Sequence, residues 1–317
     1  MDNKKGGIFM SDEIAFANTA LESFAALVTL VLLLACIAKI EMQRGIKNTT
    51  PKDVKRKTLD YILIIWLVLH IIVLMADVLS WIAMDSGKNE VWLLFMVNLT
   101  FTCLYLECMV YTYYVKESIC QHEMIGNTYV YLVMLSTVIA IILWITSDIS
   151  GKFYYLDAQG NYTRGSIYWL CQFYCIIVMC GNIVILLKHR KALGRHDVLS
   201  LLMYGLIPIA SIPAQMLWKS TTFNLAATLA LIYICISVHM AQYDRIVEQE
   251  KLLIQQEHEL SMNQMQMMIA QIQPHFLYNS LTALAQLCSK DPKEAKKAII
   301  NFADYWRNHI NAIDKKE

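Results

Sequence analysis

The chain has 317 residues, of which 57% are hydrophobic and 17% charged, against about 25% charged residues in an average soluble protein. Its mean hydropathy of +0.42 excludes a disordered chain, argues against an ordinary soluble enzyme and favours a protein that lies mostly in lipid. The net charge of +1 provides no broad basic field, so we expect no nucleic-acid partner.

Residues 1–240 contain seven apolar segments, each close to the ~20 residues that a helix needs to cross a bilayer core. They cover residues 14–38, 59–83, 91–115, 128–146, 166–187, 198–218 and 223–239. The sequence therefore predicts an all-α protein whose N-terminal domain is a seven-helix transmembrane bundle. The last span has no lysine for a retinal Schiff base, which excludes a retinal protein. No Asp-Arg-Tyr follows the third span, which argues against a G-protein-coupled receptor.

Lysine and arginine residues are distributed unevenly between the two sets of loops. The loops after the first, third, fifth and seventh spans carry fourteen of them, whereas the opposite side carries six. Because positively charged loops stay in the cytoplasm, the N-terminus is expected outside the membrane and the C-terminus inside. The longest outer loop, Ser147 to Gly165, has aromatic residues around a turn-rich stretch and predicts a small hairpin on the membrane surface.

Five polar side chains in the predicted spans are candidates for function, because ionisable groups in lipid are costly and often functional. At a rise of 1.5 Å per residue, His70 and Glu107 lie at a similar depth, and Asp77 and Asn98 form a second pair nearer the outside. Asn182 falls near the first pair. These residues are candidates for a sensor pocket, or for a His–Glu pair that responds to pH or a cation; the alternative is hydrogen bonding that only holds the bundle together.

The nine cysteines contain no Cys-x-x-Cys pair and lie in apolar segments or in stretches that we place in the cytoplasm. We therefore expect neither a disulfide framework nor a zinc site. One alternative is a metal site formed by Cys103, Cys108 and Glu107 near His70, although no tight ligand spacing supports it.

Residues 241–272 are expected to continue the seventh span as one helix. Apolar residues recur every seven positions in two neighbouring columns. The further column that a strong coiled coil would fill with apolar residues is polar here. The columns are Ile246, Leu253, Leu260 and Met267; Val247, Ile254, Ser261 and Met268; and Glu250, Glu257 and Gln264. The pattern predicts a weak coiled coil, either a dimer helix that transmits signals between two nearly balanced packings or a plain amphipathic linker.

The chemistry is expected in the segment that reads QIQPHFLYNSL. Pro274 removes a backbone donor and should distort the helix at that point. His275 follows directly, and Asn279 lies one turn later on the same face. A histidine side chain titrates near pH 6.5 and is substantially neutral in the cytoplasm. A neutral ring nitrogen can attack a phosphoryl group, while the nearby amide holds the ring or positions the phosphate.

A second helix follows a break at Ser289-Lys290. Asp291 is placed to cap it, with Pro292 at the first position and Glu294 completing a capping box. Its apolar residues recur at helical spacing and are Ala295, Ile299, Phe302, Trp306 and Ile310. The two helices predict an antiparallel hairpin, and two hairpins from two chains would form a four-helix bundle with His275 on its outer face.

QIQPHFLYNSL closely resembles the phosphoacceptor box of LytS/YehU-type sensor histidine kinases, which reads near Gln-x-x-Pro-His-Phe-Leu-Phe/Tyr-Asn. The resemblance implies that His275 is the phosphoacceptor and that Asn279 is a second functional residue. It also implies a homodimeric kinase of a two-component system in a bacterial cell membrane, with ATP and Mg²⁺ as cofactors. A response regulator in the cytoplasm is the implied partner that receives the phosphoryl group. Phe276 stands where other kinase families have an acid, so the proton acceptor is left open.

The resemblance further implies an ATP-binding domain, yet the sequence contains neither an asparagine box for magnesium nor an Asp-x-Gly-x-Gly box. We expect a truncated piece of a longer kinase, because both hairpin helices are intact and the sequence stops near a domain boundary. A natural acceptor protein without its own kinase is the alternative. The expected organisation is a sensor domain at residues 1–240, a signalling helix at 241–272 and a phosphoacceptor hairpin at 273–317.

Two other functions are left open by the sequence. A membrane receptor could signal by protein contact alone, with the hairpin as its docking platform. A transporter could use the layer of His70 and Glu107 as its path. The sequence does not identify the stimulus, which includes extracellular and membrane ligands.

Overall fold

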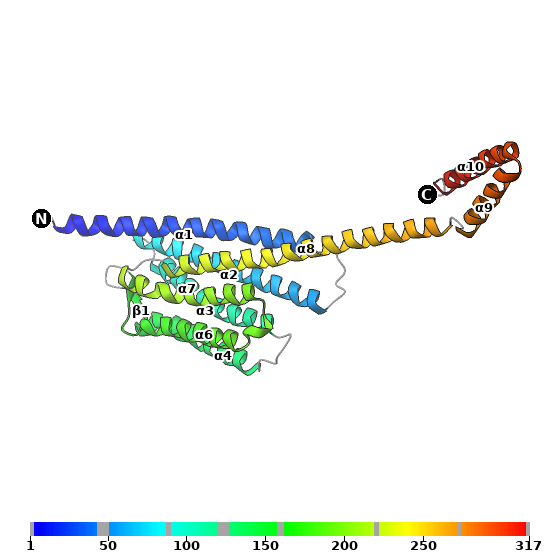
Figure 1. The fold of residues 1–317 in the computed structure, drawn as a ribbon. Coiled ribbons are helices and arrows are strands. Elements are labelled where there is room, and N and C mark those ends of the chain that lie inside the picture. Colours follow the sequence, from blue (N-terminus) through cyan, green and yellow to red (C-terminus); the bar gives the residue numbers. More distant parts are fainter. Residues whose placement is uncertain are drawn as a thin grey trace. The chain divides into compact units, whose positions relative to one another are not determined.

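The computed structural model describes residues 3–42, 51–86, 90–119, 127–156, 162–218, 222–271 and 274–314. These residues are almost entirely helical, with one two-stranded sheet, so the predicted all-α class is confirmed (Figure 1). Contacts divide the chain into two units, Met1–Gln242 and Tyr243–Glu317. The further predicted boundary between residues 272 and 273 lies outside the described residues.

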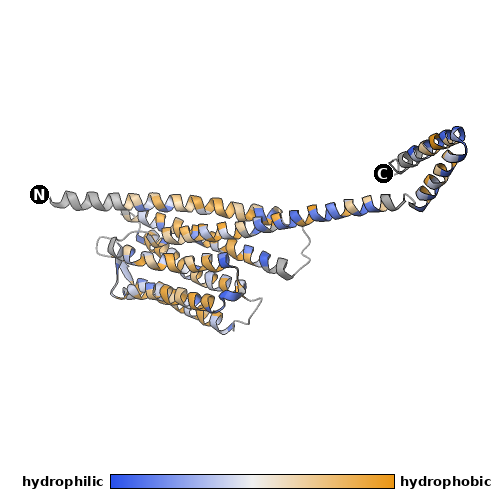
Figure 2. Cartoon of the chain, viewed as in Figure 1, coloured by the Kyte–Doolittle hydropathy of each residue, from blue (hydrophilic) through white to orange (hydrophobic). Residues whose placement is uncertain are grey.

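The first unit consists of long apolar helices together with two short helical turns, α5 and η1. They are α1 (Asn3–Met42), α2 (Pro51–Ser86), α3 (Glu90–Ile119), α4 (Asn127–Ile145), α5 (Ser147–Ser150), α6 (Trp169–Lys188), the 3₁₀ turn η1 (Arg190–Ala192), α7 (Arg195–Trp218) and the start of α8 (Thr222–Gln271). Within the described ranges, seven helical stretches are long and apolar enough to cross a membrane. The predicted set of seven spans is thus confirmed, and the protein is a multi-pass membrane protein. Figure 2 shows the apolar residues of these helices in orange.

The interior of this bundle is organised around α3, which packs against α2, α4 and α6. Trp66 on α2 is fully buried, and its ring lies 4.4 Å from that of Tyr204 on α7 and 5.6 Å from that of Tyr111 on α3. On α4, in contrast, large apolar side chains such as Leu132 and Ile142 are exposed. A broad exposed apolar surface around a packed aromatic interior is what helices surrounded by lipid require.

A small antiparallel hairpin follows α5. Strand β1 (Tyr154–Leu156) pairs with β2 (Tyr162–Arg164), with their first and last residues opposite each other. Ser147 fixes its entry, because the buried hydroxyl of Ser147 accepts two backbone N–H groups at 3.0 Å, one of them from Tyr154. The ring of Trp144 packs 4.8 Å from that of Tyr154. The predicted hairpin is confirmed, while its place at the membrane surface stays a prediction.

The second unit contains the end of α8, then α9 (Pro274–Lys290) and α10 (Pro292–Asp314). As predicted, the seventh span and the helix after it form one continuous helix, α8. Helices α9 and α10 pack together as the predicted hairpin, with Ala295 buried between them. Phe302 and Trp306 are half-buried, whereas Ile299 is exposed because a single hairpin covers only part of the apolar face. The side chain of Ile310 lies outside the described residues.

Asp291 caps α10 as the sequence predicted. Its carboxylate accepts the backbone N–H groups of Lys293 at 3.0 Å and Glu294 at 3.1 Å, which satisfies two of the free donors at the start of a helix. The expected capping box is not formed. The N–H of Asp291 donates instead to the carbonyl of Leu287 at 2.8 Å, so it is not available to the Glu294 carboxylate.

A buried ion pair joins α1 to α2. Lys39 Nζ lies 2.6 Å from Asp60 Oδ1, and both side chains are almost completely enclosed. The sequence placed Lys39 in a loop, but α1 continues past the apolar window to Met42 and carries Lys39 into the bundle. Because an ion in a low-dielectric interior is costly without its partner, each charge depends on the other.

We expect the single substitutions Lys39→Met and Asp60→Leu each to lower the free energy of unfolding by about 3–5 kcal/mol, because each leaves one buried charge unpaired. The double variant should regain most of that loss. Lys188→Met, at an exposed position at the end of α6, is the matched control and should change stability by less than about 0.5 kcal/mol. The measurement is reversible unfolding in mixed micelles, and additive losses in the double variant would contradict the pairing.

Candidate functional site

His275 and Asn279 lie together on an exposed face at the start of α9. His275 is the second residue of the helix, and both side chains are exposed. The side-chain nitrogen Nδ2 of Asn279 lies 3.2 Å from Nδ1 and 3.3 Å from Nε2 of the imidazole. The amide can therefore donate to whichever ring nitrogen lacks a proton, and it holds the ring against the helix.

Pro274 is the first residue of α9, while α8 ends at Gln271. Proline is favoured at a helix start, because its fixed φ suits the helix and its missing N–H has no helical partner to lose. Residues 272 and 273 lie outside the described residues, so the distortion expected at Pro274 stays a prediction. His275 lies in the first turn of α9. The positive end of a helix dipole favours a negatively charged group in the first turn.

Phe276 contributes to packing at this turn. Its ring lies 6.0 Å from the ring of Tyr305 on α10, so it ties the start of α9 to the second helix of the hairpin. The contact fixes the orientation of the turn that carries His275.

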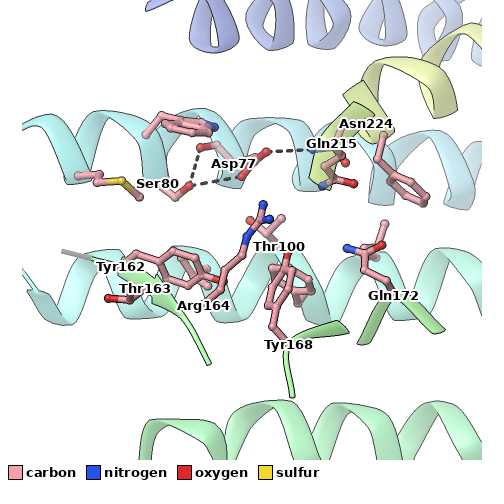
Figure 3. A pocket seen from close by; sticks show the side chains of 16 residues that line it. Asp77, Ser80, Thr100, Tyr162, Thr163, Arg164, Tyr168, Gln172, Gln215 and Asn224 are labelled. Atoms are coloured by element: carbon pink, nitrogen blue, oxygen red, sulfur yellow. Dashed lines mark hydrogen bonds between the residues drawn. The ribbon is translucent and has the colours of Figure 1, made fainter. Parts of the chain in front are cut away.

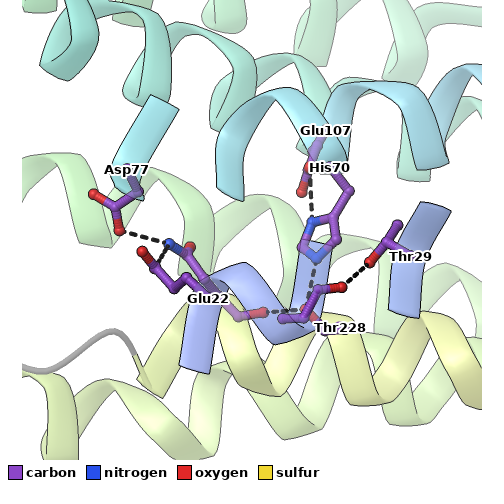
Figure 4. A network of polar contacts seen from close by, with 8 residues as sticks. Glu22, Thr29, His70, Asp77, Glu107 and Thr228 are labelled. Atoms are coloured by element: carbon purple, nitrogen blue, oxygen red, sulfur yellow. Dashed lines mark hydrogen bonds and ion pairs between the residues drawn. The ribbon is translucent and has the colours of Figure 1, made fainter. Parts of the chain in front are cut away.

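A second polar site lies inside the membrane bundle. His70 Nδ1 on α2 lies 3.0 Å from Glu107 Oε1 on α3, and His70 Nε2 lies 2.8 Å from Thr228 Oγ1 on α8. The side chains of His70 and Glu107 are only 1% and 2% exposed. The structure thus brings together the pair that the sequence placed at one depth, and it adds a partner from α8 (Figure 4).

The network continues along α8 to a pair of carboxyl groups. The Thr228 hydroxyl also lies 2.9 Å from the backbone carbonyl of Asn224, to which it can donate. The side-chain amide of Asn224 donates to Glu22 on α1 at 2.9 Å and to Asp77 on α2 at 3.0 Å. The network therefore joins four helices, and Asn224 is the residue at which α1, α2 and α8 meet.

Two of the predicted candidates lie elsewhere. Asn98 is within hydrogen-bond distance of Asp148 at 3.1 Å and of the Tyr154 hydroxyl at 2.6 Å, and does not pair with Asp77. Asn182 donates to the Thr112 hydroxyl on α3 at 2.9 Å, and no hydrogen bond among the described residues joins it to His70 or Glu107. Equal depth in the bilayer was not sufficient to predict these contacts, because depth does not determine which face of a helix a side chain occupies.

Tyr154 links the hairpin to α3 and α5. Its hydroxyl lies within hydrogen-bond distance of both Asn98 and Asp148. Burial first, and then the neighbouring Asp148 carboxyl, raise the pKa of the Tyr154 hydroxyl, so it keeps its proton and acts as a donor. Asn98 is accordingly part of the attachment of the outer hairpin.

The alternative of a metal site at Cys103, Cys108 and Glu107 has no supporting geometry. In the part of the chain that the structure describes, no three His, Cys, Asp or Glu side chains come together in a way that could hold a metal ion. Glu107 is instead engaged with His70.

Asp77 also borders a cavity of about 460 Å³, which lies among α2, α3, β2, α6, α7 and α8. Figure 3 shows Arg164 extending from β2 toward the wall of the cavity that carries Asp77. Gln172, Gln215 and Asn224 add polar groups. Sequence reasoning counted Arg164 only as a loop charge, since nothing local indicates that the hairpin folds back over the helices.

Glu22 and Asn224 were likewise missed. Glu22 is completely buried in α1 and Asn224 is 9% exposed in α8. The available signal was the same one that singled out His70, a polar side chain within an apolar span. Their pairing could not be predicted, because they are separated by about two hundred residues of sequence.

Residues 263–317 match the family model described as Histidine kinase. The predicted resemblance to sensor histidine kinases of the LytS/YehU type is thereby confirmed. The matched segment includes the whole of α9 and α10, with His275 and Asn279, and seven membrane-length helices precede it. Among curated proteins, none matches the chain.

We expect Thr228→Val to lower the free energy of unfolding by about 1–2 kcal/mol, because the buried Nε2 of His70 loses its partner while the side-chain volume is kept. Thr146→Val is the matched control, because the Thr146 hydroxyl is exposed and bonds only to the carbonyl of Leu143 in its own turn. Its effect should stay within about 0.5 kcal/mol. Unfolding in mixed micelles measures both, and equal losses would show that the network adds no particular stability.

Proposed function

We propose that the protein is a membrane sensor histidine kinase of a two-component system. A ring nitrogen of His275 attacks the γ-phosphorus of ATP, the bond to the leaving oxygen breaks, and ADP departs. The phosphoryl group then passes from His275 to an aspartate of a response regulator in the cytoplasm. The observation that carries the proposal is the exposed His275–Asn279 pair, in the segment that matches histidine kinases.

ATP with Mg²⁺ enters this reaction as a substrate. The described residues offer no cluster of ligands for a metal ion, and the sequence lacks the two nucleotide-binding boxes. We therefore assign the nucleotide site to none of these residues. Their own part is to present the imidazole, hold it with the Asn279 amide and stabilise the added negative charge at the start of α9.

The exposed apolar surface of the second unit supports a homodimer. Ile246, Leu253, Leu260 and Met267 form one column along α8, and each is 60–61% exposed. On the hairpin, Phe276, Leu281 and Ile299 are exposed as well. A second copy of the chain would cover the α8 column as a coiled coil and the hairpin as a four-helix bundle, which leaves the polar His275–Asn279 face accessible.

We further propose that the protein lies in the cell membrane of a bacterium with its N-terminus outside. The Lys and Arg excess in alternate loops supports this orientation. The stimulus would act on the bundle and reach His275 through α8, because the same continuous helix carries Asn224 and Thr228 at one end and leads to the hairpin at the other. Lipid is then the permanent surrounding of the sensor.

His275→Gln should abolish labelling of the whole native gene product by γ-phosphate-labelled ATP in its own membranes. Asn279→Ala should slow labelling by about tenfold or more, because a misplaced ring attacks poorly. The measurement is an acid-labile, base-stable label on the protein. His258→Gln is the matched control, because His258 is an exposed histidine on α8, and it should label normally.

An acid-labile label that persists in the His275→Gln variant would overturn the assignment. If the native protein dimerises and binds ATP but takes up no label, a receptor that signals by contact would be favoured in its place.

The homodimer predicts disulfide cross-linking along one face of α8. Leu253→Cys lies in the exposed apolar column and should give cross-linked dimers under mild oxidation, since a disulfide needs Cα atoms within about 7 Å. Gln255→Cys is the control on the opposite face, where Gln255 bonds to Glu259 at 3.1 Å. The native cysteines are the same in both variants, so equal yields of dimer on a denaturing gel would contradict the proposed interface.

A further inference from the structure

We infer that the cavity bordered by Asp77 and Arg164 binds a small zwitterion of the amino-acid or short-peptide class with an apolar side chain. The inference that this ligand binds depends only on the geometry of the cavity. The further step, that this zwitterion regulates phosphorylation of His275, rests on the proposed function.

An acidic and a basic side chain border the same cavity from different elements. Asp77 belongs to α2 and Arg164 to β2, and both border the space of about 460 Å³. Among the residues that the structure describes, no ion pair joins Arg164 to a carboxylate. Its guanidinium carbon lies 4.7 Å from the centre of the Tyr168 ring. The cavity thus offers a carboxyl group to an ammonium group and a guanidinium group to a carboxylate.

Two buried polar atoms on the wall lack partners among the described residues. They are the indole N–H of Trp81 and the side-chain oxygen of Gln215. A buried donor or acceptor without a partner costs about 1–3 kcal/mol in general, so such groups normally meet water or a ligand. Trp81 and Gln215 thus add one donor and one acceptor to the residues around the cavity, beside Asp77 and Arg164.

The other side chains that border the cavity are mostly apolar and favour a ligand with an apolar side chain. Phe101, Tyr162 and Phe223 border the cavity together with Leu104 and Val97. Sites for small molecules typically enclose about 300–1,000 Å³ and combine apolar walls with a few placed polar groups. Among the described residues that border the cavity, Arg164 is the only cation, which argues against a ligand with several phosphates, and the volume argues against a folded protein domain.

The cavity meets the polar network at Asn224. The Asn224 amide donates to Asp77 at 3.0 Å, and its backbone carbonyl accepts from Thr228. An ammonium group that binds Asp77 competes directly with that amide. Ligand binding would therefore change the hydrogen bonding of α8, the helix that continues to the hairpin, and this gives the zwitterion a route to the phosphoacceptor.

The test uses the full chain in lipid nanodiscs with a defined panel of probes. The panel holds L-phenylalanine, L-leucine and the dipeptides alanyl-phenylalanine and leucyl-leucine, each with its N-acetyl and its amide derivative. Blocking either charge should weaken binding by at least about tenfold, the loss expected from one charge-assisted contact. Calorimetric titration measures the dissociation constants.

Two variants assign each charge of the ligand to its partner. Asp77→Asn should remove the preference for the free amine over the N-acetyl derivative while keeping the preference for the free carboxylate. Arg164→Gln should do the reverse. A variant that merely unfolds cannot give these opposite patterns. Arg195→Gln, an exposed arginine at the start of α7, is the control and should bind like the native chain.

Saturable binding with the crossed selectivity supports the inference. The absence of binding by every member of the panel, or equal binding of free and blocked probes, overturns it. Labelling of His275 is measured separately, on the whole native gene product in its own membranes. If a probe binds and His275 takes no label, the ligand site is supported and the proposed function is overturned. If His275 is labelled and no probe binds, the proposed function is supported and the ligand site is overturned.

Discussion

The side-chain amide of Asn224 is the interaction on which the bundle depends. It donates to Glu22 and Asp77 at 2.9 and 3.0 Å, so a single group holds α1, α2 and α8 together at a point that lipid surrounds. Polar groups in such surroundings must find partners within the protein, because no water is available to replace them. The continuation through Thr228 to His70 and Glu107 extends this requirement to α3. A change at any of these residues therefore affects the position of α8 relative to its neighbours in the bundle.

Helix α8 connects this interaction to the chemistry, because its two halves have different partners. Its first half is buried among apolar and polar side chains of the bundle, where Ala227 and Leu231 are almost completely enclosed. Its second half exposes an apolar column that a second chain is proposed to cover. The helix is continuous from Thr222 to Gln271, so a rotation at one end is carried to the other. Helix α9, which carries His275, begins at Pro274.

Sequence reasoning predicted the parts of this structure that depend on local patterns. Seven apolar stretches, the cap at Asp291 and the placement of Asn279 one turn after His275 all follow from spacing along a single helix. The contacts that needed the relative rotation of helices were not predictable in that way. Asp77 and Asn98 lie at similar depth, yet one meets Asn224 and the other meets Tyr154. Arg164 joined the cavity only because the hairpin folds back over α2 and α3, a long-range arrangement that no local signal specifies.

The weakness of the proposed coiled coil has a quantitative consequence for signalling. Glu250, Glu257 and Gln264 occupy the column that a strong zipper would fill with apolar residues, so neither packing of two α8 helices is expected to be much more stable than the other. Raising the population of one packing from about 10% to about 90% requires the equilibrium constant between the two packings to change by a factor of about 80, or about 2.6 kcal/mol. One or two buried hydrogen bonds, each costing about 1–3 kcal/mol when left unmade, supply energy of that size. Exchange of the Asn224–Asp77 bond for a ligand contact is therefore sufficient in magnitude to reset α8, and a strongly zippered helix would resist the same change.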